Sequence, residues 1–198
     1  MPQLFIIAGP PGIGKSSSGK LFQPAKIESL NHDALFLYYK AKGEYNYDDL
    51  SNLKANDFIQ QKLINNEDFG VEINLGYENH YELLRYVKNK FPKYDITVCL
   101  FFTDELQLCL DRAIIREKSG GHHVSEKVIR EMYANTIELL QKNTHLITNL
   151  MLVDITYDSI DLVFELNPNE NRIFISSKLP EWVLANFPQI PLLKNSPK

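Results

Sequence analysis

The segment Gly9-Pro10-Pro11-Gly12-Ile13-Gly14-Lys15-Ser16 restricts the fold more than any other feature of this sequence. It matches the pattern G-x-x-x-x-G-K-[ST] in full, and it follows an apolar run at residues 4–8 that is typical of a strand buried on both faces. Glycines let such a loop turn its backbone N–H groups inward, where they form a cradle for phosphate oxygens. The sequence therefore predicts a strand, a phosphate-binding loop and a helix over residues 14–22.

The same loop predicts how a nucleotide is held. Lys15 is expected to reach the β- and γ-phosphates and the Ser16 hydroxyl to bind Mg²⁺, so we expect ATP and Mg²⁺ as cofactors, with Ser17 also beside the nucleotide. GTPases normally carry the guanine motif N-K-x-D. The nearest segment here, Asn89-Lys90-Phe91-Pro92, lacks the aspartate, which argues against a GTPase.

Apolar runs of strand length alternate with segments of helical period along the chain, which predicts an α/β fold with a mainly parallel sheet. The expected strands are 4–8, 25–30, 69–73, 96–102 and 150–155, and the further expected helices are 50–65, 78–91, 104–117 and 125–141, with Asp104 as an N-cap. We expect one domain over residues 1–198, folded as a three-layer P-loop sandwich.

The C-terminal part has a different pattern. The segments 162–166 and 172–176 flank the turn-rich stretch 167–171, which predicts an antiparallel hairpin appended to the sheet. A short helix at 180–187 and a frayed tail at 188–198 are expected to follow, so that hairpin and helix together occupy about 160–187.

Composition excludes several classes of protein. The net charge is −4, so no global basic field is present, and we expect neither nucleic acid nor a membrane surface as a partner. No apolar stretch approaches the roughly 20 residues that cross a bilayer. The two cysteines, Cys99 and Cys109, lie in apolar segments and are interpreted as core thiols of a cytoplasmic protein.

Polar residues after the predicted strands are candidates for the second substrate, since ligands of open parallel sheets lie beyond the carboxyl ends of the strands. Asp33 is predicted to be the base that takes a proton from an acceptor hydroxyl; the alternative is that it caps the next helix. Glu72 interrupts an apolar run and is expected to hold a substrate hydroxyl or a metal-bound water, and Asn74 follows it. The alternative for Glu72 is a structural ion pair or a solvated strand face.

Arg112 and Arg116 are four residues apart, so they share one face of the predicted helix. With Gly120-Gly121 as a hinge after them, they suit the charge of a transferring phosphoryl group, and His122 is expected to contact phosphate or substrate. The alternatives are a solvated helix face paired with Asp111 and Glu117, and a surface turn histidine.

These residues together resemble the zeta-toxin-like P-loop kinases. The resemblance rests on Gly9 to Ser16, on Glu72-Ile73-Asn74-Leu75, on the R-x-x-x-R of Arg112 and Arg116, and on Gly120-Gly121-His122 with Val124. It implies ATP-dependent phosphorylation of the amino sugar of UDP-N-acetylglucosamine. It also implies that Asp33 is the catalytic aspartate, that Glu72 and Asn74 contact the sugar nucleotide, and that an antitoxin protein is a candidate partner.

The sequence departs from that pattern at two positions. Asn74 replaces a threonine, and Gly76 replaces the arginine with which the toxin holds its substrate, so a kinase for another nucleotide, sugar or antibiotic stays open. Two further alternatives are an ABC-type ATPase, because Lys118-Ser119-Gly120-Gly121-His122 imitates L-S-G-G-Q, and a nucleotide-binding module without catalysis.

Overall fold

The structure, a computed structural model, describes residues 1–156 and 159–193. Its centre is a seven-stranded sheet in the order β2-β3-β1-β4-β5-β6-β7. The strands are β1 (Gln3–Ala8), β2 (Glu28–Leu30), β3 (Phe69–Ile73), β4 (Asp95–Phe102), β5 (Asn149–Asp154), β6 (Asp161–Asn167) and β7 (Arg172–Ile175). The first five are parallel, and β6 and β7 add antiparallel at one edge. The predicted α/β fold with a C-terminal antiparallel hairpin is confirmed.

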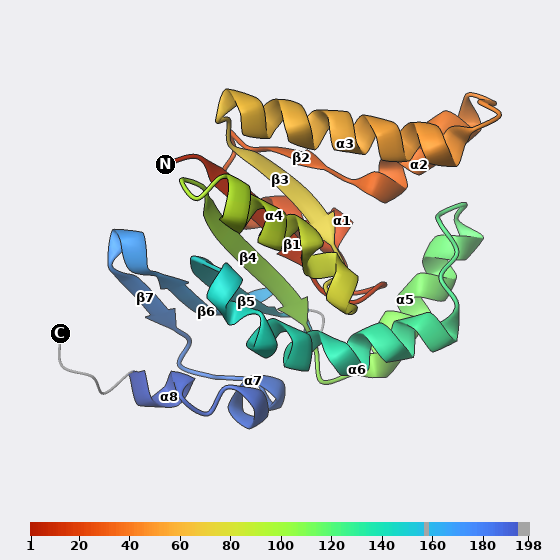
Figure 1. Cartoon of the computed structure of the whole chain (residues 1–198). Coiled ribbons are helices and arrows are strands. Elements are labelled where there is room, and N and C mark those ends of the chain that lie inside the picture. The colour runs from red at the N-terminus through yellow and green to blue at the C-terminus, as the bar shows by residue number, and fades with distance from the viewer. Residues whose placement is uncertain (157–158, 194–198) are drawn as a thin grey trace.

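Helices cover both faces of this sheet (Figure 1). They are α1 (Lys15–Ser18), α2 (His32–Ala41), α3 (Tyr47–Asn65), α4 (Glu82–Lys90), α5 (Leu106–Lys118), α6 (Glu126–Lys142), α7 (Glu181–Asn186) and α8 (Ile190–Leu193), with 3-10 turns η1 (Gly19–Leu21), η2 (Glu78–Tyr81), η3 (Thr144–Leu146) and η5 (Pro168–Glu170). Within the described residues, no helix combines the length and apolar character needed to cross a bilayer.

Strand β1 is buried on both faces, as the apolar run at residues 4–8 predicts. Leu4, Ile6 and Ala8 pack into the core on one face, together with α3, α4 and α7, and Phe5 and Ile7 pack into the core on the other face, together with α5. A strand with apolar neighbours on both faces reads as a continuous apolar run. Cys99 and Cys109 are free thiols inside the second core, as predicted.

Four expectations about elements were wrong. The helix predicted at 14–22 is α-helical only to Ser18 and continues as the 3-10 turn η1 over Gly19–Leu21. Gly19 packs closely on β1, where a Cβ would lie 2.7 Å from Cγ2 of Ile7. Asp104 is not the cap of α5: the cap position belongs to Glu105, whose side chain makes no capping bond. Burial raises the pKa of Asp104, while backbone N–H groups of Trp182 and Glu181 bond to it and act in the opposite direction.

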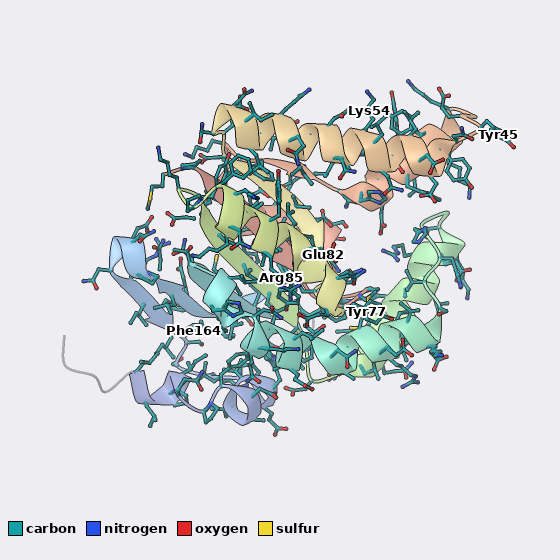
Figure 2. All side chains as sticks on the ribbon, viewed as in Figure 1. Tyr45, Lys54, Tyr77, Glu82, Arg85 and Phe164 are labelled. Atoms are coloured by element: carbon teal, nitrogen blue, oxygen red, sulfur yellow. The ribbon has the colours of Figure 1, made fainter. Side chains whose placement is uncertain are left out.

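The other two errors concern segments without a clear pattern. Helix α2 was not predicted, because none of its residues is buried and it shows no apolar stripe. The tail expected to fray from 188 contains α8, in which Ile190 is buried in the core; residues 194–198 lie outside the described part. Helices α2 and α3 form a pair that extends past the sheet, with Tyr45 fully exposed at its end (Figure 2).

Candidate phosphate and acceptor site

The loop between β1 and α1 has the backbone that its glycines predict. Gly9, Gly12 and Gly14 have φ angles of 138°, 80° and 99°. A Cβ on Gly12 would lie 2.1 Å from the carbonyl oxygen of Cys109, and one on Gly9 would lie 2.4 Å from that of Phe101. Only glycine fits at these positions, since the loop lies directly against α5 and the end of β4. The result is a backbone cradle of the kind that holds phosphate oxygens.

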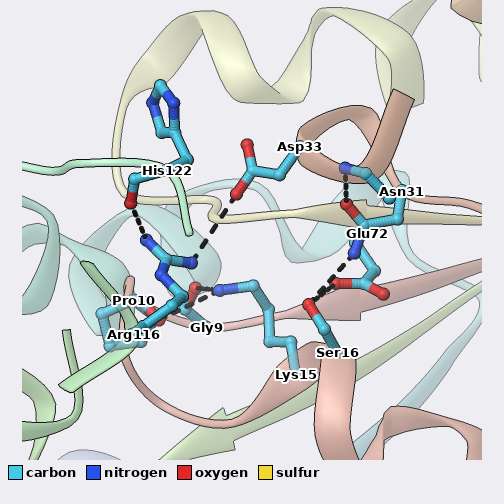
Figure 3. Close-up of polar contacts among 10 residues, drawn as sticks. Gly9, Pro10, Lys15, Ser16, Asn31, Asp33, Glu72, Arg116 and His122 are labelled. Atoms are coloured by element: carbon cyan, nitrogen blue, oxygen red, sulfur yellow. Dashed lines mark hydrogen bonds and ion pairs between the residues drawn. The ribbon is translucent and has the colours of Figure 1, made fainter. Parts of the chain in front are cut away.

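Lys15 folds back over this loop. Its ammonium donates hydrogen bonds to the carbonyl oxygens of Gly9 at 2.7 Å and of Pro10 at 3.0 Å (Figure 3). Burial lowers the pKa of Lys15 to about 8, and the carboxylates of Glu72 and Asp33 act in the opposite direction. Lys15 is therefore still largely protonated at neutral pH, and it is held at the cradle by acceptors that a phosphate group could replace.

Ser16 joins the loop to two neighbouring strands. Its hydroxyl donates a hydrogen bond to Oε2 of Glu72 at 2.7 Å and accepts one from Nδ2 of Asn31 at 3.0 Å (Figure 3). Asn31 is also the N-cap of α2, because its Oδ1 accepts from the backbone N–H of Ala34 at 3.0 Å. Glu72 thus contacts the phosphate loop through Ser16, and its side chain stays half-buried.

The oxygen atoms around Ser16 fit the chemistry of Mg²⁺. A hydroxyl and a carboxylate meet there, and Mg²⁺ usually takes one or two carboxylates together with waters and substrate phosphates. Among the described residues, no group of three or more His, Cys, Asp or Glu side chains could enclose a metal without such help. Ser16 and Glu72 are therefore the residues suited to hold a cation that arrives with a nucleotide.

Asp33 and Arg116 face each other across the site. The guanidinium Nη1 of Arg116 lies 3.7 Å from Oδ2 of Asp33, and its Nη2 donates to the carbonyl oxygen of His122 at 3.1 Å (Figure 3). Because Asn31 caps α2, the alternative that Asp33 is the cap is wrong. The alternative partners of the arginines are engaged elsewhere, since Asp111 accepts from Gln107 and Glu117 pairs with His123.

One open cavity of about 580 Å³ brings most of the predicted residues together. Its walls include these predicted residues: Pro11, Gly12, Gly14, Lys15, Ser16, Ser17, Asp33, Glu72, Asn74, Arg112, Arg116 and His122. Three loop residues lie outside the wall: Gly9 and Pro10 accept bonds from Lys15, and Ile13 points into the core. Next to Asn74, buried Leu75 has a φ of 54°, a strained backbone of the kind that often accompanies functional sites.

Seven wall residues are not among the predicted site residues: Asn31, His32, His123, Val124, Ser125, Val128 and Met132. Four of them carried a signal, because Asn31 and His32 directly follow a predicted strand, His123 follows His122, and Val124 belongs to the motif on which the family resemblance rests. Val128 and Met132 carried none, since an apolar helical spacing is the same whether it faces a core or a cavity.

No protein-family model matches the sequence, and no curated protein matches it. Solved structures do match at the level of the fold. An AvrRxo1-ORF1:-ORF2 structure with ATP matches with a TM-score of 0.64 and 15% identity, over 89% of this chain and 61% of that one. The PezAT chromosomal toxin–antitoxin system of Streptococcus pneumoniae gives a TM-score of 0.63 and 13% identity, over 99% and 88%.

A candidate kinase from Chloroflexus aurantiacus matches with a TM-score of 0.58 and 17% identity, over 81% of this chain and 92% of that one. This chain thus spans less than two thirds of the AvrRxo1 chain and most of the other two. At these identities the likeness establishes the fold. The P-loop kinase-type fold is therefore confirmed, and so, at the level of the fold, is the resemblance to the zeta-toxin-like proteins.

Proposed function

We propose that this chain is a kinase that transfers the γ-phosphate of ATP to a hydroxyl group of a small molecule. One observation carries the proposal: a lysine from the phosphate loop, an aspartate from α2 and two arginines from α5 line one cavity. A phosphate cradle alone would serve any nucleotide-binding protein. A carboxylate at the open end of the cradle, beside cations that match a phosphoryl group, is what phosphoryl transfer to an alcohol requires.

In this mechanism Asp33 accepts the proton of the acceptor hydroxyl. The hydroxyl oxygen forms a bond to the γ-phosphorus, and the bond between that phosphorus and the β–γ bridging oxygen breaks, so that ADP leaves with the electron pair. Lys15, Arg112 and Arg116 stabilise the negative charge on the phosphoryl oxygens, because their positive charges are already in place. The contact between Arg116 and Asp33 keeps the proposed base next to one of the cations that would stabilise the transferring phosphoryl group.

Ser16 and Glu72 would hold Mg²⁺ in this proposal. When bound, the cation would neutralise negative charge on the phosphates of ATP and so favour the departure of ADP. Asn31 keeps the Ser16 hydroxyl oriented through its 3.0 Å hydrogen bond, and Glu72 accepts from that hydroxyl.

The acceptor is a finer part of the proposal. The resemblance of the sequence makes a sugar nucleotide such as UDP-N-acetylglucosamine the first compound to test, and another nucleotide, a sugar or an antibiotic are the alternatives. A protein partner is also proposed, since two structures of similar fold are a toxin–antitoxin system and a complex of two chains. Co-purification from the native host would test it.

Incubation with ATP, Mg²⁺ and a panel of acceptors, followed by ³¹P NMR, tests the kinase proposal. We expect a new phosphomonoester resonance in stoichiometry with ADP, lost in Asp33→Ala protein that still binds ATP. Release of inorganic phosphate regardless of the acceptor would support the ATPase alternative instead. ATP that stays intact with every acceptor would support a nucleotide-binding module, and either result would overturn the kinase proposal.

A further inference from the structure

The charges of the cavity are unevenly divided between its two ends. The cations Lys15, Arg112 and Arg116 gather at the phosphate loop, where Nη1 of Arg112 lies 3.8 Å from the position of a Cβ on Gly14. The wall formed by the ends of β2 and β3 carries the carboxylates of Asp33 and Glu72 and the amides of Asn31 and Asn74. The carboxylates lie beside the cations, because Oδ2 of Asp33 is 3.7 Å from Nη1 of Arg116 and Glu72 accepts from Ser16 of the phosphate loop. Cations and carboxylates therefore gather at the end of the cavity where phosphate transfer is proposed.

Helix α6 contributes an uncharged wall. Val128 and Met132 are four residues apart, so they share one face of the helix, and Val124 continues that face just before it. The cations of α6 are used elsewhere. Arg130 pairs with Glu126 at 2.7 Å, and Lys127 lies 3.8 Å from Glu131, away from the cavity wall. No lysine or arginine of α6 thus lines the cavity.

The loop after β3 also has no room for a cation. A Cβ on Gly76 would lie 2.5 Å from Cβ of Met132 and 2.7 Å from its Cα, so the loop backbone packs directly on α6. The hydroxyl of Tyr77 then donates to Oε2 of Glu131 at 2.9 Å and fixes this contact. Any side chain at position 76 would have to push the loop and α6 apart.

Two of the three histidines of the wall have a ring nitrogen paired with a protein group. His32 Nε2 lies 2.8 Å from Oδ1 of Asn52, and His123 Nδ1 lies 2.9 Å from Oε1 of Glu117. The ring of His122 packs edge-on against Phe36, with ring centres 5.4 Å apart. A phosphate group on the part of the acceptor that lies against α6 would therefore meet an apolar wall, with no lysine or arginine among the described wall residues of that helix.

We propose that the acceptor is an uncharged or cationic molecule that combines hydroxyl groups with an apolar face, such as a sugar, an aminosugar or a nucleoside, and that it carries no phosphate. This proposal rests on the kinase function proposed above. It places acceptors without phosphate, such as a sugar or an antibiotic, ahead of the sugar nucleotide that the resemblance of the sequence puts first. The reacting hydroxyl lies at Asp33, further hydroxyl or amino groups face Asn74, and the apolar face packs on Val124, Val128 and Met132.

Matched acceptors that differ only in phosphate test this proposal. N-acetylglucosamine, glucosamine, N-acetylglucosamine 1-phosphate and UDP-N-acetylglucosamine form one series, adenosine and AMP form a second, and kanamycin adds a polycation. We expect phosphate transfer to at least one uncharged or cationic member, with kcat/KM at least about tenfold above that of its phosphorylated counterpart. Transfer to phosphorylated members alone would overturn the substrate class and leave the kinase function standing. ATP that stays intact with every member would instead overturn the kinase function, and this proposal with it.

A variant of the α6 wall adds a second test. Val128→Lys introduces a cation at the uncharged wall, and Val128→Leu is the matched control. We expect Val128→Lys to shift the preference by about tenfold towards the phosphorylated member of a pair, with the KM for ATP unchanged. A preference that stays the same in Val128→Lys protein, or that shifts equally in Val128→Leu protein, would contradict the proposed position of the acceptor.

Discussion

The guanidinium of Arg116 lies 3.7 Å from the carboxylate of Asp33, although the two residues come from helices far apart in the sequence. The pair joins α2 to α5 at the cavity. Both side chains stay partly accessible, with 53% of the Asp33 side chain and 36% of the Arg116 side chain exposed. An exposed pair of this kind adds little to stability, so its location at the cavity points to a role in function.

Asp33→Asn protein is expected to lose about 10²–10⁴ in kcat, because the amide cannot take the proton of the acceptor. The Kd for ATP should stay within a factor of about three, since the phosphate cradle is made by other residues. Asp49→Asn in the first turn of α3 is the matched control and should leave kcat unchanged. Normal turnover of Asp33→Asn protein would exclude Asp33 as the base.

Arg116→Ala protein should lose about 10²–10³ in kcat, since one preorganised charge at the phosphoryl group is removed. Arg130→Ala is the control, because Arg130 makes an exposed pair with Glu126 on α6. Its effect on the free energy of unfolding should stay below about 1 kcal/mol, with kcat unchanged. Equal losses of kcat in the two variants would show that Arg116 has no special role.

The lowered pKa of Lys15, about 8 against an ordinary 10.5, predicts a pH dependence of stability. Between about pH 8 and pH 10.5 the unfolded chain binds a proton that the native protein does not, so the free energy of unfolding increases as the pH rises. Below about pH 8 Lys15 is protonated in both states, and the full cost of burying its ammonium group lowers the stability of the native protein. Lys15→Met protein should therefore be more stable at pH 7 by about 1 kcal/mol, after discounting for partial exposure, although inactive.

Urea unfolding at pH 7 and pH 10.5 measures this difference. The gap in the free energy of unfolding between Lys15→Met and the unchanged protein should close at the higher pH. Lys20→Met, at an exposed position one turn further on, should show no such gap. A gap that is equal at both pH values would mean that Lys15 affects stability through packing alone.

Gly12→Ala and Gly43→Ala distinguish the cost of a positive φ in a residue with a Cβ from the cost of a steric clash of that Cβ. Both glycines have positive φ, 80° and 74°, but a Cβ on Gly12 meets the carbonyl of Cys109 and a Cβ on Gly43 meets nothing within 4 Å. Gly43→Ala should cost about 1 kcal/mol of stability. Gly12→Ala should lower the free energy of unfolding by about 2 kcal/mol more than Gly43→Ala, because the loop must also move away from α5. Calorimetry should detect no ATP binding to Gly12→Ala protein. Equal costs would contradict the close approach.

Trp182→Phe tests how the C-terminal helices are attached to the sheet. The indole N–H donates to Oδ1 of buried Asp154 at 2.8 Å, and Thr156 donates to the same oxygen at 2.8 Å. Loss of one donor to a buried carboxylate should lower the free energy of unfolding by about 1–3 kcal/mol, with kcat unchanged. A double-mutant cycle with Asp154→Ala should give a coupling of similar size, and no coupling would mean that the loss is one of packing.

Local chemistry was enough to predict the phosphate loop and the strands before and after it. The motif Gly9 to Ser16 acts through backbone conformations that its own glycines allow. The central strands β1 and β4 are nearly continuous apolar runs because both of their faces are buried. The carboxyl ends of parallel strands meet at one edge, so Asp33, Glu72 and Asn74 could be gathered from three positions along the chain.

The tertiary structure alone decided the remaining features. Helix α2 has no buried residue and so no apolar period in its sequence. Asn31 acts both as the N-cap of α2 and as a hydrogen-bond donor to Ser16, and the second contact depends on how the two segments pack together. Val128 and Met132 line a cavity because the loop at Gly76 packs on α6, a contact between segments far apart in the sequence. The sequence by itself determined the loop that is proposed to hold phosphate, since that loop is one short segment. The structure decided what surrounds the acceptor, since that depends on how α2, α5 and α6 pack together.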